Sequence, residues 1–153
     1  MKILDEGGKN PLIVETADDF DTLIKFALEK RPFVPWPLKS VFAQKAVANR
    51  ALNKKIFAEM RGEADSSDFK AELAKIKAPT LIMWGDHDRI IHVDNAGEFA
   101  KAIPGSRMHI FTDVGHAPMI EIPAESARVF SEFILSNSDR REVARVYIKT
   151  VAR

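Results

Sequence analysis

The stretch from Ala78 to His116 decides the fold of this 153-residue chain. It opens with APTLIMWGDHD (residues 78–88), continues with a helical pattern, and closes with RMHIFTDVGH (residues 107–116). Short apolar runs bounded by turn residues are typical of buried strands, which predicts strands at Thr80 to Trp84 and at Arg107 to Phe111. Asn95 to Ile103 carries a helical pattern between them. The stretch therefore predicts a β-α-β unit with two parallel strands and a right-handed crossover.

Ionisable side chains follow both predicted strands. Asp88 comes shortly after the first strand, and His116 comes shortly after the second. In open α/β sheets the carboxyl ends of parallel strands meet at one edge, and active sites lie in the crevice there. We therefore expect the Asp88 carboxylate within hydrogen-bond reach of a His116 ring nitrogen, or in the same cleft.

Three motifs in this region carry a family resemblance. Pro79-Thr80-Leu81-Ile82-Met83-Trp84-Gly85-x-x-Asp88 is followed by Gly115-His116 and then by Glu121-x-Pro123. This order and spacing resemble the C-terminal part of an α/β-hydrolase, a family whose triad runs nucleophile, acid, histidine along the chain. The resemblance implies that Asp88 is the acid and His116 the base, which takes the nucleophile's proton.

The first half of the chain more weakly resembles the lid of monoacylglycerol-lipase-like members. The matching words are Asn10-Pro11-Leu12, Asp19-Phe20 and Arg31-Pro32-Phe33-Val34-Pro35. The expected fold class is α/β, as a partial α/β-hydrolase fold in which most of the sheet is missing. We expect a helical lid or cap at residues 1–76, a β-α-β-α unit of parallel strands at 77–137, and a terminal helix or tail at 138–153.

The nucleophile of the family is missing from these residues. The chain has no Gly-x-Ser-x-Gly elbow and no Cys, and the glycine-rich oxyanion segment is also missing. We expect a C-terminal fragment of a lipase- or esterase-like serine hydrolase, inactive by itself, whose nucleophile precedes Met1 in a longer protein. One alternative is a truncated product that only binds apolar ligands or a partner. Another is an epoxide hydrolase, dehalogenase or carbon–carbon hydrolase of the same superfamily.

The substrate-binding candidates are apolar side chains on loops. Arg31 to Pro37 holds three prolines and therefore predicts an extended connector. As lids of the resembled family do, it could line an acyl pocket for an ester or lipid, or it could pack over the core. The candidate residues are Phe33, Val34, Trp36 and Ile90.

The remaining helices are predicted from their ends and apolar stripes. Thr16 with Asp19 resembles a capping box that begins a helix ending near Lys30. Leu38 to Met60 reads as one long helix with a basic face, which could contact a lipid surface but is better explained as a solvated face. Further helices are expected from Ser67 to Ile76, from Pro123 with its apolar stripe at Ala127, Phe130, Phe133 and Ile134, and at residues 139–153.

Other carboxylates and imidazoles near the pair are interpreted without a metal. Asp86, His87, Asp88, His92 and Asp94 are close in sequence, but their spacing fits neither a calcium loop nor a zinc-binding helix pair. We expect no metal and no other cofactor. Asp113 and Glu121 flank His116 and are interpreted as surface or capping carboxylates.

Composition bounds the remaining classes. A formal net charge of +1 gives no reason to expect nucleic acid, and the absence of Cys excludes disulfides and thiolate chemistry. No apolar run approaches membrane-spanning length, and the start turns acidic too early for a secretory signal, which favours a cytoplasmic location. The inner edge of the Thr80 to Trp84 strand lacks a predicted neighbour, so we expect self-association or pairing with an N-terminal part.

Overall fold

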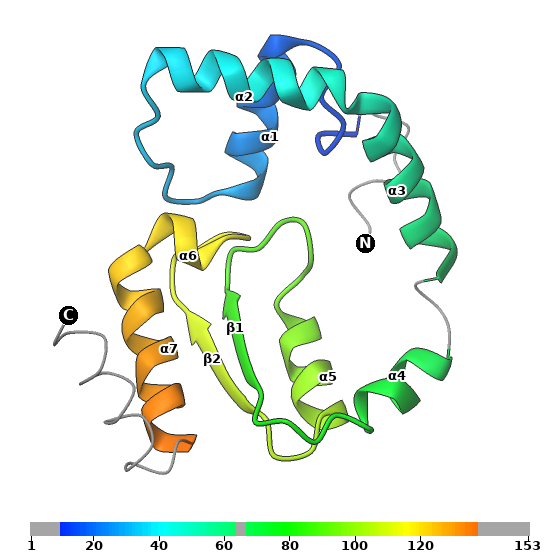
Figure 1. The fold of residues 1–153 in the computed structure, drawn as a ribbon, viewed down its shortest axis with the longest axis vertical. Coiled ribbons are helices and arrows are strands. Elements are labelled where there is room, and N and C mark those ends of the chain that lie inside the picture. Colours follow the sequence, from blue (N-terminus) through cyan, green and yellow to red (C-terminus); the bar gives the residue numbers. More distant parts are fainter. Residues whose placement is uncertain (1–9, 64–66, 138–153) are drawn as a thin grey trace, which may run out of the picture.

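The computed structural model describes residues 10–63 and 67–137, and within them a helical region precedes a pair of parallel strands (Figure 1). The elements are α1 (Ala17–Ala27), α2 (Trp36–Ala48), α3 (Arg50–Glu63), α4 (Ser67–Leu73), β1 (Leu81–Gly85), α5 (Asp94–Ala102), β2 (Arg107–Phe111), α6 (Pro118–Glu121) and α7 (Pro123–Asn137). The helix predicted at residues 139–153 lies outside the described part.

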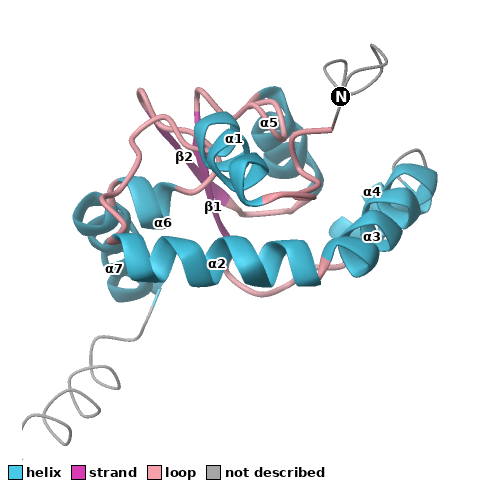
Figure 2. Cartoon of the chain, turned by 90° about the horizontal axis from the view of Figure 1, so that it is seen from above, coloured by secondary structure: helices cyan, strands magenta, loops and turns pink. Residues whose placement is uncertain are grey.

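The predicted β-α-β unit is confirmed. β1 pairs with β2 in parallel, with Leu81 opposite Arg107 and Gly85 opposite Phe111. β2 has the predicted bounds, whereas β1 is shifted by one residue because Gly85 still pairs within the ladder. Helices α5 and α7 lie on opposite sides of the strand pair (Figures 1 and 2). In the described residues β1 has β2 as its one strand neighbour, so its second edge is unpaired.

The core lies between β2, the loop after it and α7. Phe111, Val114 and Val129 form its buried cluster, against which Leu81, Met83 and Ile122 pack. α7 begins at Pro123 as predicted, since proline suits the first helical turn. Of the apolar residues that predicted this helix, Phe133 is buried while Phe130 is 53% exposed, and Ser126 and Val129 complete the buried face. The helix has more apolar residues than its buried face has positions, so the apolar pattern predicts the helix but does not say which of its residues are buried.

In the helical region, the capping signal predicted a helix start correctly, whereas the apolar stripes predicted the extent of the helices less well. The Thr16–Asp19 capping box is present, because each side chain accepts a hydrogen bond from the other residue's backbone N–H. α1 ends at Ala27, before the predicted end near Lys30. The predicted long helix is instead α2 and α3, separated at Asn49, whose N–H turns back to the Lys45 carbonyl. A break was expected at residues 61–65, but residues 61–63 belong to α3, which continues to Glu63.

The segments that join these helices are partly as expected. The proline-containing connector is extended to Pro35, and α2 then includes Trp36 and Pro37 in its first turn. α4 ends at Leu73, short of the predicted Ile76. Phe69 of α4 is 53% exposed, yet its ring meets the Phe99 ring of α5 edge-on, with the ring centroids 6.0 Å apart. Among the described helices we find none that combines the length and the apolar character needed to span a membrane.

Candidate active site

Asp88 is held in a tight turn just after β1. Its Oδ1 accepts hydrogen bonds from the backbone N–H groups of Ile90 at 2.8 Å and Ile91 at 2.9 Å. Aspartate favours such turns because its short side chain can bond the backbone a few residues further on. The residue is only 7% exposed. This turn therefore fixes one carboxylate oxygen and leaves Oδ2 for a second partner.

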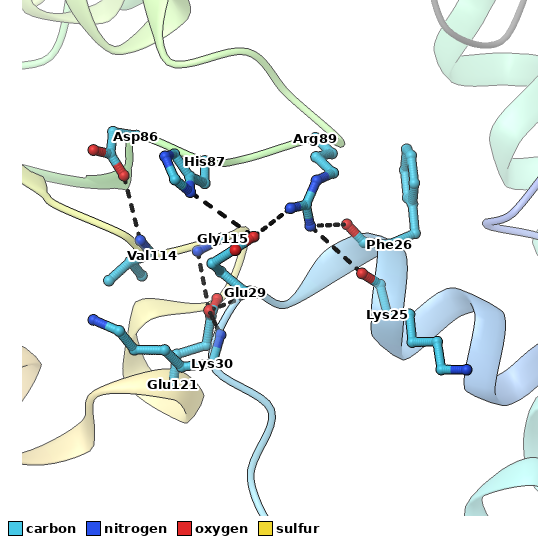
Figure 3. A network of polar contacts seen from close by, with 10 residues as sticks. All are labelled: Lys25, Phe26, Glu29, Lys30, Asp86, His87, Arg89, Val114, Gly115 and Glu121. Atoms are coloured by element: carbon cyan, nitrogen blue, oxygen red, sulfur yellow. Dashed lines mark hydrogen bonds and ion pairs between the residues drawn. The ribbon is translucent and has the colours of Figure 1, made fainter.

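The histidine loop, residues 112–122, packs directly against the loop after β1. Asp86 N–H donates to the Phe111 carbonyl at 3.0 Å, and His87 N–H donates to the Val114 carbonyl at 2.9 Å. The Asp86 side chain accepts from Val114 N–H at 3.3 Å (Figure 3). The loop turns at Asp113, whose φ of 56° lies in the left-handed region that aspartate tolerates. These contacts bring the ends of both strands together.

The two strand-end side chains meet as predicted. Asp88 Oδ2 lies 2.9 Å from His116 Nδ1, so the expected contact is confirmed. The Asp88 side chain is 3% exposed, whereas that of His116 is 39% exposed. A carboxylate at Nδ1 holds the imidazole in one orientation and leaves Nε2 free to accept a proton. This geometry is that of an acid–histidine pair, and the catalytic role of each residue stays a prediction.

Glu121 is a capping carboxylate, one of the two interpretations made from the sequence, and it joins two segments that are far apart in the chain. It is half-buried, and its Oε2 accepts from Gly115 N–H at 3.0 Å and from Glu29 and Lys30 N–H at 2.8 Å each (Figure 3). Its Oε1 accepts from Ala117 N–H at 3.2 Å. The side chain caps backbone donors from two segments, one of them about ninety residues away in sequence. In the sequence, the Glu121-x-Pro123 motif was the one signal that singled out Glu121.

A second polar group joins the turn at Asp88 to the end of α1. The Arg89 guanidinium donates to the Glu29 carboxylate and to the Lys25 and Phe26 carbonyls, the two carbonyl contacts being 3.5 Å (Figure 3). His87 Nδ1 lies 3.8 Å from the Glu29 carboxylate. Sequence reasoning missed this group, because its members are about sixty residues apart and share no motif.

The predicted substrate-binding residues differ in their exposure and surroundings. Phe33 is 91% exposed and Trp36 is 79% exposed, so both contact little of the described chain. Val34 is half-buried, and Ile90 belongs to the turn that holds Asp88. Their substrate-binding role stays a prediction.

The acidic and imidazole side chains near Asp88 have partners of their own. His92 Nδ1 lies 3.0 Å from Asp94 Oδ2, and Asp86 bonds the histidine loop. In residues 10–63 and 67–137 no three histidine or acidic side chains converge as a metal site would require. The described residues therefore offer no ready-made ligand set for a metal ion.

Comparison with known protein families shows the family to which the chain belongs. Residues 25–123, more than half of the chain, match the family described as alpha/beta hydrolase fold. The chain belongs to the α/β-hydrolase family. The resemblance and the fold class inferred from the motifs around Asp88 and His116 are therefore confirmed. The structure shows part of that fold, a helical region with two parallel strands.

Relatives of this α/β-hydrolase include lipases. Lipase 1 of Psychrobacter immobilis is 35% identical over 125 residues, which are 81% of this chain and 39% of that protein. Monoacylglycerol lipase ABHD6 of Mus musculus is 26% identical over 148 residues, 94% of this chain and 44% of that protein. The crystal structure of a membrane phospholipase A, a bacterial virulence factor, superimposes with a TM-score of 0.77 at 35% identity. That superposition covers 86% of this chain and 42% of the other.

These matches support a lipase- or esterase-like α/β-hydrolase. The chain spans about two fifths of the length of the curated relatives it matches, 39% of the bacterial lipase and 44% of the mouse enzyme. The activity of those whole proteins therefore enters below only as a proposal.

Proposed function

We propose that this chain supplies the acid and the histidine of a Ser-His-Asp triad that hydrolyses carboxylic esters. The observation that carries the proposal is the 2.9 Å contact between Asp88 Oδ2 and His116 Nδ1 at the shared end of two parallel strands. In such a triad the histidine takes the nucleophile's proton, while the buried acid orients the ring and stabilises its cation. Asp88 and His116 have the chemistry and burial that these roles require.

The reaction needs a serine from outside the two strands. The 153 residues contain neither a Gly-x-Ser-x-Gly elbow nor a cysteine, and the family resemblance assigns the nucleophile to an earlier part of the fold. The serine oxygen would attack the ester carbonyl and pass its proton to His116 Nε2. His116 would then protonate the departing alkoxide, and water would release the acid from the acyl-enzyme by the same route.

The substrate class follows from the relatives and from the apolar cap. Proteins named lipase and monoacylglycerol lipase match most of this chain. In this proposal the helical region from α1 to α4 is the cap, and Phe33, Val34, Trp36 and Ile90 contact the acyl chain of a lipid or small ester. The exposed aromatic rings of Phe33 and Trp36 are then part of the substrate-binding surface.

A chimera tests the function. The segment of Psychrobacter immobilis Lipase 1 that precedes the matched region would be fused to this chain, and hydrolysis of p-nitrophenyl butyrate measured. We expect saturable turnover that falls by about a thousandfold or more in Asp88→Asn and His116→Ala chimeras, because triad members act as a unit. The separate 153-residue chain should not exceed the background rate of free histidine.

Two results would contradict this function. An active chimera that is indifferent to His116→Ala would remove the histidine from the reaction. Turnover by the 153-residue chain alone, abolished by His116→Ala, would show that these residues contain a substitute nucleophile.

A further inference from the structure

The turn that carries Asp88 and the loop that carries His116 both contact the same short segment at the end of α1, residues 25–30, which we call the α1 exit segment. From the turn at Asp88, Arg89 reaches the Lys25 and Phe26 carbonyls and the Glu29 carboxylate. On the other side, His116 N–H donates to the Ala27 carbonyl at 2.8 Å. Residues 25–30 of the proposed cap therefore contact both loops that carry the pair, and Figure 3 shows the contacts of Arg89 and Glu121 with this segment.

Glu121 holds the backbone on both sides of His116. Gly115 and Ala117 each donate an N–H to this carboxylate, at 3.0 Å and 3.2 Å. The oxygen that binds Gly115 also accepts from Glu29 and Lys30, so three N–H groups converge on Oε2. Charged acceptors form stronger hydrogen bonds than neutral ones, and a carboxylate can serve several donors at once. One side chain thus ties the histidine loop to the α1 exit segment.

The contact leaves little freedom between the two segments. A Cβ added at Gly115 would lie 2.5 Å from the Ala27 carbonyl oxygen and 2.9 Å from the Glu29 nitrogen. Those distances are far below normal van der Waals contact, so the two backbones touch directly at this glycine. A displacement of the α1 exit segment would therefore reach His116 both through Glu121 and through this backbone contact.

We propose that Glu121 is a positioning residue through which the α1 exit segment of the cap sets the distance between His116 and Asp88. The proposal rests on the function proposed above only in that it takes His116 to be the base. Glu121 acts through the backbone of its neighbours and does not touch the reacting atoms. Placement of the cap and alignment of the histidine are then one event, because the same carboxylate oxygen serves both.

The test uses amide hydrogen exchange and proton NMR on the intact chain with Glu121→Gln. Glutamine keeps one carbonyl oxygen but places an NH₂ group against backbone donors. We expect exchange at Gly115, Ala117, Glu29 and Lys30 to accelerate by about tenfold or more, because opening becomes easier where these bonds weaken. We also expect the downfield proton of the His116 Nδ1–H···Asp88 contact, assigned by its loss in His116→Gln, to weaken or broaden.

A matched control and a structural reference accompany this measurement. Glu125→Gln makes the same chemical change four residues away at the exposed start of α7, and it should alter none of these signals. The Trp84 and His109 amides, which point into the β1–β2 ladder, should keep their protection in all variants, which shows that the fold is intact. If exchange changes only at Gly115 and Ala117, Glu121 caps its own loop and the proposal is overturned.

A second variant changes the contact between Glu121 and the cap on the cap side, at Lys30. Lys30→Pro removes the N–H that donates to Glu121, whereas Lys30→Ala keeps it and removes only an exposed side chain. We expect faster exchange at Gly115 and a weaker His116 signal in the proline variant alone. Unchanged signals in a folded Lys30→Pro chain would overturn the proposal. Neither readout needs turnover, so failure of the chimera to hydrolyse esters is a separate result.

Discussion

The two side chains of the pair reach the same 2.9 Å contact by different means. Asp88 is buried and held by its own turn, through N–H groups two and three residues further on. His116 is partly exposed, and its loop is held by Ala27, Glu29 and Lys30, either directly or through Glu121. The position of the acid is therefore fixed by contacts within its own turn, and that of the histidine by contacts with a segment distant in sequence.

Because of this difference, the Asp88 turn and the histidine loop depend to different degrees on the rest of the chain. A turn that closes over two or three residues forms wherever its sequence is present, since its loop-closure entropy is small. The histidine loop needs a segment about ninety residues away to be in place before its backbone donors are satisfied. We therefore expect changes in the cap to affect His116 before they affect Asp88.

The largest expected effect comes from adding a side chain at Gly85, where the end of β1 meets the histidine loop. A Cβ at Gly85 would lie 2.2 Å from the carbonyl oxygens of both Val114 and Gly115, which are backbone atoms and cannot rotate away. Gly85→Ala should lower the free energy of unfolding by about 3 kcal/mol, because the end of β1 must separate from the histidine loop. The midpoint of urea unfolding measures this loss.

Gly97→Ala is the matched control for that substitution. No heavy atom lies within 4 Å of a Cβ built at Gly97, which is inside α5. Alanine should stabilise the helix there by about 0.5–1 kcal/mol. Equal midpoints for the two variants would show that the loops at Gly85 have room to part.

An intermediate effect is expected from two substitutions at Asp88. Asp88→Ala removes the acceptor of the Ile90 and Ile91 N–H groups as well as the partner of His116, and should cost about 2–3 kcal/mol. Asp88→Asn keeps a carbonyl oxygen for the turn and should cost about 1 kcal/mol. Urea unfolding of both variants gives the comparison, and equal losses would show that the turn is not what holds the acid.

The smallest effect is expected far from both loops, at Glu98 on α5. Hydrogen bonds from Lys101 and Lys70, with the attraction of their charges, hold the pKa of Glu98 below its ordinary value. A lowered carboxyl pKa stabilises the fold above the ordinary glutamate pKa of about 4.3, and this stabilisation disappears as pH falls through the lowered value. The Glu98 side chain is half exposed to solvent, so solvent screening keeps the effect small.

Thermal unfolding of Glu98→Gln beside the unaltered chain measures that contribution. We expect the variant to melt at most about 2 °C lower at pH 7, and the difference to vanish in acid. A difference that persists below pH 3 would assign it to something other than the ionised carboxylate.

Much of the pair's surroundings could be predicted because it is encoded locally. The apolar runs that end at Gly85 and Phe111 predict two strands, and the topology of a β-α-β unit then brings Asp88 and His116 to one edge. The Thr16–Asp19 capping box likewise needs only neighbouring residues. Each of these features is decided within one turn or one strand–helix–strand step.

What could not be predicted depends on contacts across the chain. Glu121 looks like any loop carboxylate until Glu29 and Lys30 are placed beside it. The Arg89–Glu29 pair has no motif, and burial on α7 is chosen by what β2 presents to it. The division between α2 and α3 at Asn49 was also not predicted, because the apolar stripe continues through it.

The shared oxygen of Glu121 has a consequence for how such a unit could be exchanged between proteins by recombination. A gene segment encoding residues 78–137 would carry both side chains of the pair, because they lie 28 residues apart. It would also carry Glu121 with Gly115 and Ala117 but without Glu29 and Lys30, leaving the carboxylate two of its four backbone donors. A recipient would have to offer two consecutive free N–H groups at the same place, so crossover points that keep residues 25–30 with the strand pair should survive preferentially.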